Sequence, residues 1–418
     1  MRLHFLLVAA LLAVACGDDD GMMAGLPDAG GDLDMGSDVD AGTDTDMGMG
    51  DPDMGLMCPD SPTVPEAWDC TAATPIDEGD AITADANTWT WVPFPDTQCM
   101  DGTPFGIGVN INPESDRLMI FFEGGGACFD RTTCLTGVAN RDGYDEEDFD
   151  ETAAGRLLGQ PFARDDETNP VRDFNMVYIP YCSGDVFGGN IEDSPSTTLT
   201  HVGRRNTAAI LRRVLPTFPS MSDVLLTGSS AGGLGAVINY TQVQEAFGCT
   251  PVNMFNDAGA ILTDEFLAPC QQQLLRDAWE FDGFIADEHV DAVCQEDGGG
   301  LVTYYAYLAQ RYPDQRFAYA TGVQDGTFRF FYSWGLSEGC DTGSADAYTG
   351  EMFEMGVNAL RGYLTPFDNF NTFYLSGDNA QEHTFLSRLG EATESGLTLG
   401  EYLGDFIDPG ADFVDAGP

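Results

Sequence analysis

The chain has 418 residues, of which 69 are acidic and 17 basic, and its formal net charge is -52. This balance argues against nucleic acid as a partner, because a phosphate backbone requires a basic face. All 17 basic residues are Arg, so Schiff-base, Walker A and kinase lysines and a Ser-Lys dyad are excluded. An activated serine in this chain would have to rely on one of its four histidines.

Residues 1–15 have the pattern of a secretory signal peptide, because the apolar run after Arg2 is too short to span a bilayer. The run ends in Ala13-Val14-Ala15-Cys16, which is similar to the bacterial lipoprotein cleavage box, where the cysteine becomes the lipidated first residue. We expect lipidation at Cys16 and a place in the cell envelope, at the outer membrane or the cell surface. An ordinary signal peptide and a secreted protein are the alternative.

Residues 16–57 have the composition of an acidic, disordered tether. Residues 17–57 carry twelve Asp and no basic residue, in repeated Asp-Met-Gly and Asp-Ala-Gly units with almost no large aliphatic side chain. Weak Ca²⁺ binding by the Asp-x-Asp pairs is the alternative, but no Gly-kinked loop with a closing Glu follows. We expect residues 58–418 to form one strongly acidic catalytic domain.

Ten cysteines follow Cys16, and an even number in an exported chain indicates a disulfide framework. None of them has the spacing of a zinc site, so we expect no metal and no cofactor. The short separations favour Cys58 with Cys70, and Cys128 with Cys134, as the first pairs.

Strand and helix patterns alternate from residue 102 onward. Apolar runs predict strands, and longer amphipathic stretches predict helices. The first two strands are expected to form a hairpin or to lie side by side. Interleaved strands and helices indicate an α/β fold with a mostly parallel sheet covered on both faces and stapled by disulfides. The strands are expected over 105–112, 117–122, 175–181, 224–227, 252–255, 316–323 and 371–375, and the helices over 202–215, 265–279, 286–294 and 301–311.

The sequence Gly228-Ser229-Ser230-Ala231-Gly232 lies between a short buried strand and a stretch of helical composition. This is the strand-turn-helix context of a nucleophile elbow, in which the central Ser230 hydroxyl stands off the sheet beside a helix N-terminus. The turn leaves no room for a side chain at either flanking glycine. A plain Gly/Ser-rich turn is the alternative reading.

The general base and its acid are expected after the serine, the acid first and the histidine second. His383 lies in the loop after the last apolar strand, whereas His289 has the pattern of a solvated helix surface, so His383 is favoured. Asp325 ends the preceding strand and is the favoured acid. Asp257 is the alternative acid, and Asp378 is disfavoured because it shares a loop with His383.

A developing oxyanion needs preorganised N–H donors. We expect one from Ala231 and others from the glycine loop 121–128, whose exit a Cys128–Cys134 bridge would hold.

Four motifs in order resemble the pectin acetylesterase and Notum family over roughly residues 99–385. They are Glu123-Gly-Gly-Gly-Ala-Cys128 with Cys134, Tyr181-Cys-Ser-Gly-Asp-Val-Phe-Gly-Gly189, Gly228-Ser-Ser-Ala-Gly-Gly233 and Asn256-Asp-Ala-Gly259. The resemblance implies an α/β-hydrolase fold and a metal-free serine carboxylesterase, which removes acetyl groups from pectin or, in Notum, a fatty acyl group from a protein serine. Ala127 departs from the family, since plant members have Trp there. By motif, the resemblance assigns the nucleophile to Ser230, the acid and base to Asp325 and His383, and the oxyanion donors to Gly125, Gly126 and Ala231.

The sequence thus predicts a monomeric serine carboxylic-ester hydrolase that removes an acyl group, by expectation acetyl, from a carbohydrate or a related small ester. Membrane contact is expected only through a lipid on Cys16. An acidic domain repels polyanionic pectin, so we expect a neutral acylated glycan or a small neutral ester to suit its electrostatic field better than pectin does. The alternatives are a Notum-type lipid or protein deacylase and a tethered surface binding protein with a degenerate hydrolase fold.

Overall fold

The computed structural model describes residues 63–73, 76–135, 139, 143–294, 300–344 and 346–418. The predictions for the signal peptide, Cys16, the acidic tether and Cys58 lie outside these residues. None of the helices within the described ranges is both long and apolar enough to pass through a membrane.

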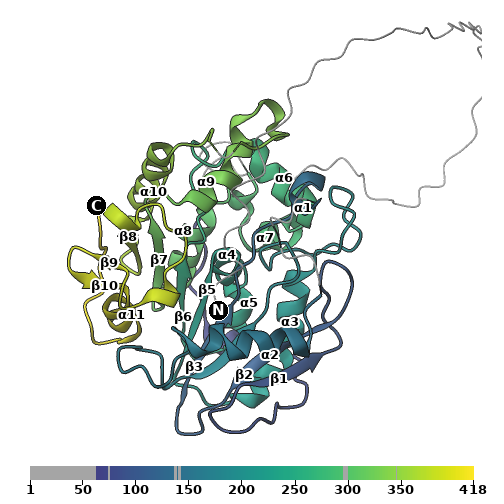
Figure 1. Cartoon of the computed structure of the whole chain (residues 1–418), viewed down its shortest axis with the longest axis vertical. Helices are drawn as coiled ribbons and strands as arrows, with labels where there is room; N and C mark the ends of the chain where they lie inside the picture. The colour runs from purple at the N-terminus through teal and green to yellow at the C-terminus, as the bar shows by residue number, and fades with distance from the viewer. Residues whose placement is uncertain (1–62, 74–75, 136–138, 140–142, 295–299, 345) are drawn as a thin grey trace, which may run out of the picture. The chain divides into compact units, whose positions relative to one another are not determined.

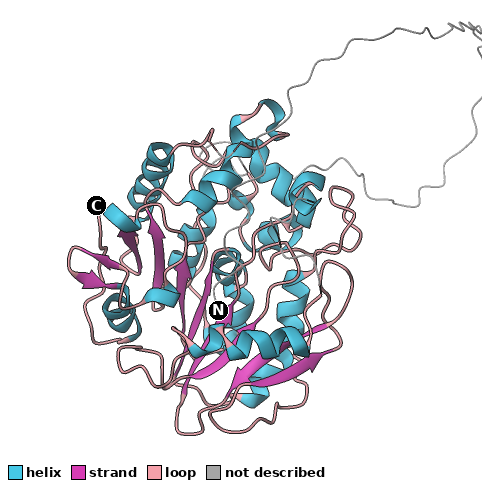
Figure 2. Cartoon of the chain, in the orientation of Figure 1, coloured by secondary structure: helices cyan, strands magenta, loops and turns pink. Residues whose placement is uncertain are grey.

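An eight-stranded sheet runs through the described part of the chain (Figures 1 and 2). Its spatial order is β1-β2-β4-β3-β5-β6-β7-β8. The pairs β1–β2 and β2–β4 are antiparallel, and every pair from β4 to β8 is parallel. The strands are β1 (Thr90–Phe94), β2 (Phe105–Asn110), β3 (Arg117–Phe122), β4 (Asn175–Ile179), β5 (Asp223–Ser229), β6 (Val252–Asp257), β7 (Phe317–Gly322) and β8 (Phe370–Leu375), with a separate hairpin of β9 (Thr393–Glu394) and β10 (Leu397–Thr398).

Helices connect the strands and cover both faces of the sheet (Figures 1 and 2). They are α1 (Arg131–Leu135), α2 (Glu146–Ala154), α3 (Gly203–Thr217), α4 (Ala231–Ile238), α5 (Tyr240–Phe247), α6 (Pro269–Trp279), α7 (Asp282–Glu288), α8 (Thr303–Arg311), α9 (Gly326–Tyr332), α10 (Gly350–Leu364) and α11 (Leu399–Ile407). This is the predicted α/β architecture, and it has the character of an α/β-hydrolase fold.

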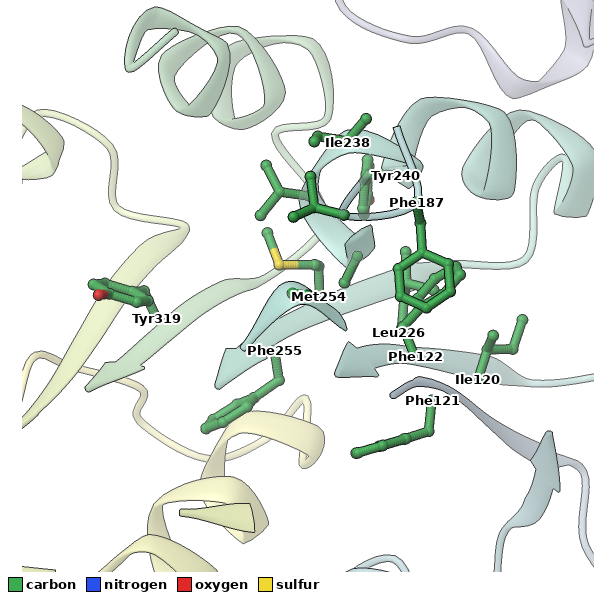
Figure 3. Close-up of a cluster of buried hydrophobic side chains, with 14 of the residues drawn as sticks. Ile120, Phe121, Phe122, Phe187, Leu226, Ile238, Tyr240, Met254, Phe255 and Tyr319 are labelled. Atoms are coloured by element: carbon green, nitrogen blue, oxygen red, sulfur yellow. The ribbon is translucent and has the colours of Figure 1, made fainter. Parts of the chain in front are cut away.

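Neighbouring residues on the central strands point to opposite faces, and each face has its own helices. Phe255 on β6 contacts Tyr402 and Phe406 of α11, while Met254 points to the side of α4 and α5 (Figure 3). Strands β4 and β7 are buried at every position. Continuous burial of this kind is typical of parallel strands covered on both sides, which explains the unbroken apolar runs in the sequence.

The carboxyl ends of four neighbouring strands place the predicted site residues on one edge of the sheet. Ser229 at the end of β5 is aligned with Asp257 at the end of β6, and Gly322 of β7 with Leu375 of β8. Ligands of open α/β sheets bind at this edge. Ser230, Asp325 and His383 all follow these strand ends within one short turn or loop.

Two expectations about the elements are wrong. The strands over 105–112 and 117–122 are not neighbours, because β4 lies between them, antiparallel to β2 and parallel to β3. Residues 118–122 and 175–179 are buried throughout, and pairing them inside the parallel part of the sheet covers both on two faces. The helix over 286–294 is interrupted: α7 ends at Glu288, His289 has extended backbone, and a 3₁₀ turn spans Val290–Ala292.

Disulfides join several parts of the described chain. The predicted Cys128–Cys134 bridge is confirmed. The predicted Cys58–Cys70 bridge is wrong, because Cys70 bonds to Cys249, 179 residues away. The strands bring distant segments together, so sequence separation is a weak guide to pairing. Further bridges join Cys99 to Cys182 and Cys270 to Cys340, and Cys294 is also disulfide-bonded. This chemistry is consistent with an exported protein.

Candidate active site

Ser230 lies at a sharp turn between the end of β5 and the start of α4. Its φ of 60° and ψ of -122° are in a region that a residue with a side chain rarely adopts. Such a conformation costs about 1–3 kcal/mol and persists only where the surrounding structure holds it in place. The predicted strand-turn-helix context of Ser230 is therefore present, with the strain that a nucleophile elbow carries.

Close backbone approach explains the glycine after Ala231. A Cβ atom at Gly232 would lie 2.0 Å from the carbonyl oxygen of Phe122, at the end of β3. Any side chain there would push α4 away from the sheet. The backbone N–H of Ser230 donates to the carbonyl oxygen of Asp257 at 2.7 Å, which fixes the turn from the other side.

Asp325 and His383 are brought together, although 58 residues separate them in the chain. His383 Nδ1 lies 2.6 Å from Asp325 Oδ2. Asp325 is fully buried, and its Oδ1 accepts the backbone N–H groups of Thr327 and Phe328 as the N-cap of α9. Because Oδ1 is occupied in this way, the carboxylate is held with its second oxygen on the imidazole. Among the described residues, His383 Nε2 is buried without a hydrogen-bond partner.

The loop that carries His383 is also held on the side of β7 and α9. The backbone N–H of Gln324 donates to the carbonyl oxygen of Ala380 at 2.7 Å, and that of Gly326 donates to Gln381 at 3.2 Å. These contacts flank Asp325 on both sides. They hold the chain segment just before His383 in a fixed position relative to Asp325.

A second buried carboxylate, Asp257, connects the serine turn to the residues after the histidine. Its Oδ2 accepts the Ser229 hydroxyl at 2.7 Å and the N–H of Leu386 at 3.1 Å, and its Oδ1 accepts the N–H of Phe385 at 2.9 Å. Ser229 precedes Ser230, and Phe385 lies two residues after His383. No hydrogen bond joins the Ser230 hydroxyl to His383 in the described structure; in enzymes without substrate such contacts are often long.

The alternative acid and base differ from the favoured ones in their contacts. Asp257 bonds to Ser229 and to backbone N–H groups, and no hydrogen bond of the described residues joins it to His383. The expectation that His289 is solvated is wrong, because the residue is 6% exposed and its ring stacks on Tyr307 of α8. Burial lowers the pKa of His289. Its Nδ1 lies 3.4 Å from the hydroxyl of Thr63, which covers it from the N-terminal side.

The glycine loop after β3 is anchored by Glu123, a role that the sequence did not reveal. The carboxylate of Glu123 accepts the N–H of Tyr181 at 3.1 Å and forms an ion pair with Arg156. Gly126 has a φ of 80°, which favours glycine. Ala231 opens α4, so its N–H is one of the helix N-terminal donors without an intrahelical acceptor. Gly126, Ser230 and Ala231 line one cavity.

The exit of the same loop is fixed at Cys128. Beyond the disulfide to Cys134, the Cys128 N–H donates to the carbonyl oxygen of Gly184 at 2.8 Å. The indole N–H of Trp279 on α6 donates to the Cys128 carbonyl oxygen, also at 2.8 Å. These contacts hold the glycine loop rigid from both ends, which preorganised donors require.

The cavity beside Ser230 is apolar. Its volume is about 830 Å³, including the part that is open to solvent. The walls come from the glycine loop and from helices α4, α6, α7, α8 and α9, and no Arg, Asp or Glu contributes to them. Val186 lines it with a φ of 50°, an outlier for a β-branched residue that no sequence signal indicated. Wall residues include Ala127, Phe129, Leu234, Ile238, Leu275, Trp279, Ile285 and Phe331.

The arginines of α3 have partners elsewhere. Arg204 pairs with Glu288 and lies over the Phe284 ring, Arg205 pairs with Glu192, and Arg212 pairs with Asp77. Arg213 donates to the backbone carbonyls of Asp80 and Pro93. None of these four arginines lines the cavity beside Ser230. No three His, Cys, Asp or Glu side chains in the described ranges are grouped as metal ligands would be.

Residues 90–296 match the family model described as pectinacetylesterase. The chain belongs to the pectin acetylesterase and Notum family. It is 36% identical over 152 residues to the palmitoleoyl-protein carboxylesterase NOTUM of Mus musculus and to that of Homo sapiens. The Drosophila melanogaster protein of that name is 29% identical over 156 residues. Each alignment covers 35% of this chain and 29%, 30% and 23% of these relatives, respectively, so less than a third of each is spanned.

The matched segment covers only part of this family member's candidate site. The glycine loop, Ser230 and Asp257 lie within residues 90–296. Asp325 and His383 lie after it, so the likeness does not extend to them. Their pairing is known from the hydrogen bond between them.

Proposed function

We propose that the chain is a serine carboxylic-ester hydrolase in which Ser230 is the nucleophile, His383 the general base and Asp325 the acid that orients it. The observation that carries this proposal is what surrounds the two ring nitrogens of His383. One ring nitrogen is held by a buried carboxylate, and the other is buried without a partner on the same edge of the sheet as a strained serine. Family membership supports the same chemistry.

The reaction follows from these roles. His383 Nε2 takes the proton of the Ser230 hydroxyl as its oxygen attacks the ester carbonyl carbon. The N–H groups of Gly125, Gly126 and Ala231 donate to the oxyanion that forms. His383 then gives its proton to the leaving alcohol, and an acyl-enzyme remains. Water, deprotonated by the same histidine, releases the acid. Asp325 stabilises the imidazolium in both halves of the reaction.

The acyl group is proposed to be apolar and longer than acetyl, which makes the deacylase alternative of the sequence analysis the better fit. An acetyl group would leave most of the apolar walls bare, whereas a longer chain would remove them from water. Ala127, at the position where plant family members have Trp, is one of those walls and leaves space open. The relatives are named palmitoleoyl-protein carboxylesterases, which supports an acyl group of this kind.

The alcohol part is proposed to be neutral. The cavity wall contains no Arg, and the arginines of α3 are engaged by carboxylates and backbone carbonyls. A polyanion such as pectin therefore meets an acidic surface without a cationic patch at the cavity.

Residues 16–57 are proposed to tether the catalytic domain to a membrane through a lipid on Cys16. After expression with its own leader in a lipoprotein-processing host, the chain should partition into detergent. The Cys16→Ser variant should remain in the aqueous phase. Intact-mass measurement of a mature chain without lipid would contradict the anchor and leave the esterase proposal untouched.

Rapid mixing with a chromogenic aryl ester tests the catalytic proposal. The acyl-enzyme mechanism predicts a burst of aryl alcohol equal to the amount of active enzyme whenever deacylation is slow. Ser230→Ala should show no burst and no steady-state turnover above background. Turnover by Ser230→Ala at the wild-type rate would overturn the proposal.

A further inference from the structure

The buried carboxylate of Asp257 is not used in the reaction as proposed. It is fully buried, and both of its oxygens accept hydrogen bonds from residues next to the nucleophile and the base. We propose that Asp257 is a positioning residue that sets the spacing between the Ser230 turn and the His383 loop. This inference rests on the proposed function.

The contacts of Asp257 are distributed over the two halves of the site. On the nucleophile side, its carbonyl oxygen accepts the N–H of Ser230 at 2.7 Å, and its Oδ2 accepts the hydroxyl of Ser229 at 2.7 Å. On the base side, its carboxylate accepts the N–H groups of Phe385 and Leu386 at 2.9 and 3.1 Å. A single side chain thus links the residue before Ser230 to the second residue after His383.

No other hydrogen bond of the described residues serves the same purpose. The backbone N–H groups of Gln324 and Gly326 hold the histidine loop to the segment around Asp325. They fix the acid relative to the base. Asp257 is the residue that fixes the base relative to the serine, whose hydroxyl is not yet bonded to His383.

The arrangement requires a carboxylate and not merely a polar side chain. Oδ1 accepts the N–H of Phe385 at 2.9 Å, and Oδ2 accepts the N–H groups of both Phe385 and Leu386 at 3.1 Å. An amide has one acceptor oxygen, so Asn in either orientation would turn its NH₂ group toward one of these N–H donors. An NH₂ group in either place would face a backbone N–H of the segment after His383, donor against donor, and displace that segment.

Retention of a charge at this depth indicates a function, because burial penalises the ionised form. Burial raises the pKa of Asp257 to about 6, against the lowering effects of the Ser229 hydroxyl, the Leu386 and Phe385 N–H groups and the charge of His383. The group is therefore ionised at neutral pH only at a cost in stability. A fold that needed only packing here would be served by an apolar residue.

The test compares Asp257→Asn with Asp291→Asn, using steady-state hydrolysis of a neutral aryl ester. Asp291 is a matched control, since it is buried and also accepts one hydroxyl and one backbone N–H, both from Thr63. We expect Asp257→Asn to lower kcat about 10- to 100-fold, because a misplacement of about 1 Å at the reacting groups costs about 100-fold. KM should change by no more than about twofold, since Asp257 does not line the cavity. Asp291→Asn should keep the wild-type kcat.

A second variant covers the possibility that Asp257→Asn does not fold. Ser229→Ala removes only the hydroxyl contact on the nucleophile side and leaves the contacts of Asp257 with backbone N–H groups in place. It should lower kcat by about tenfold with a native circular dichroism spectrum. Wild-type kcat in folded Asp257→Asn, or in Ser229→Ala, would overturn the inference, and so would an equal loss in Asp291→Asn. If Ser230→Ala is inactive while Asp257→Asn is fully active, only the inference fails; activity in Ser230→Ala would instead refute the proposed function.

Discussion

The length of the acyl chain is expected to control the rate of hydrolysis. Helix α4 lines the cavity from Ala231 to Ile238, a span of about 10 Å at 1.5 Å per residue. An extended chain advances about 1.3 Å per bond, from the 3.8 Å that three backbone bonds cover. The wall therefore accommodates an acyl chain of about eight carbons beyond Ser230.

Burial of each methylene contributes about 0.8 kcal/mol, which is about a fourfold gain in kcat/KM. We expect kcat/KM for neutral aryl esters to rise from acetyl to octanoyl, which adds six methylenes, by an upper bound of about 4 × 10³-fold, and to level off for longer chains. Initial rates on a homologous series of aryl esters at one pH measure the effect. A series in which acetyl is the best substrate and each added methylene lowers kcat/KM would refute the reasoning.

The same experiment includes a variant that fills the cavity. Ala127→Trp places a large side chain in the wall beside Ser230 and should shift the preference toward acetyl. Ala208→Trp, at an exposed position of α3, is the control and should keep the wild-type chain-length profile. An unchanged profile in Ala127→Trp would show that the acyl chain does not enter this cavity.

Three further predictions concern the acid, the buried carboxylate and the substrate. Asp325→Asn should lower kcat about 10⁴-fold in the aryl ester assay, because the imidazole of His383 loses the partner that fixes its tautomer. His289→Ala should change kcat little. The reverse ranking of the two variants would reassign the general base. Asp257 has a pKa of about 6 in the folded chain, against the usual value of 3.8. Between about pH 4 and 6 the folded chain therefore binds a proton at Asp257 that the unfolded chain has already lost. The stabilisation that this proton gives is lost as pH rises through that window. In urea unfolding, the free energy of the wild type should therefore fall by roughly 2 kcal/mol relative to Asp257→Asn between pH 4 and 7, and a constant difference would contradict the raised pKa. Acetate release from acetylated pectin should become faster with added salt, because screening weakens the repulsion between pectin and the acidic protein. The rate on a neutral ester should barely change. A faster pectin rate at low salt would contradict the charge argument.

The nucleophile turn could be predicted because its signal is local. An apolar strand, a Gly-Ser-Ser-Ala-Gly turn and a helical stretch follow one another without interruption, and Ser230 has the strained backbone that this pattern indicates. Most strands were predicted within a few residues for the same reason, since parallel strands buried on both faces have unbroken apolar runs. The position of Asp325 next to His383 followed from the order of the strands, and the hydrogen bond between them agrees with it.

Features that depend on distant contacts could not be read from the sequence. The carboxylate of Asp257 reaches a backbone N–H 128 residues away, and no local pattern distinguishes this contact from the role of a triad acid. Cys70 pairs with a cysteine that only the fold brings close. His289 stands in a polar stretch, yet Tyr307 and Thr63 cover it. In each case the partner is supplied by an element far away in the chain.

The central claim is that Ser230 is an activated nucleophile, and covalent labelling tests it most directly. Incubation of the folded protein with a fluorophosphonate, followed by proteolysis and mass spectrometry, should place one adduct on Ser230. Ser229→Ala should still be labelled on Ser230, and Ser230→Ala should not be labelled at all. No adduct on the folded wild type, or equal labelling of Ser230→Ala, would contradict the account.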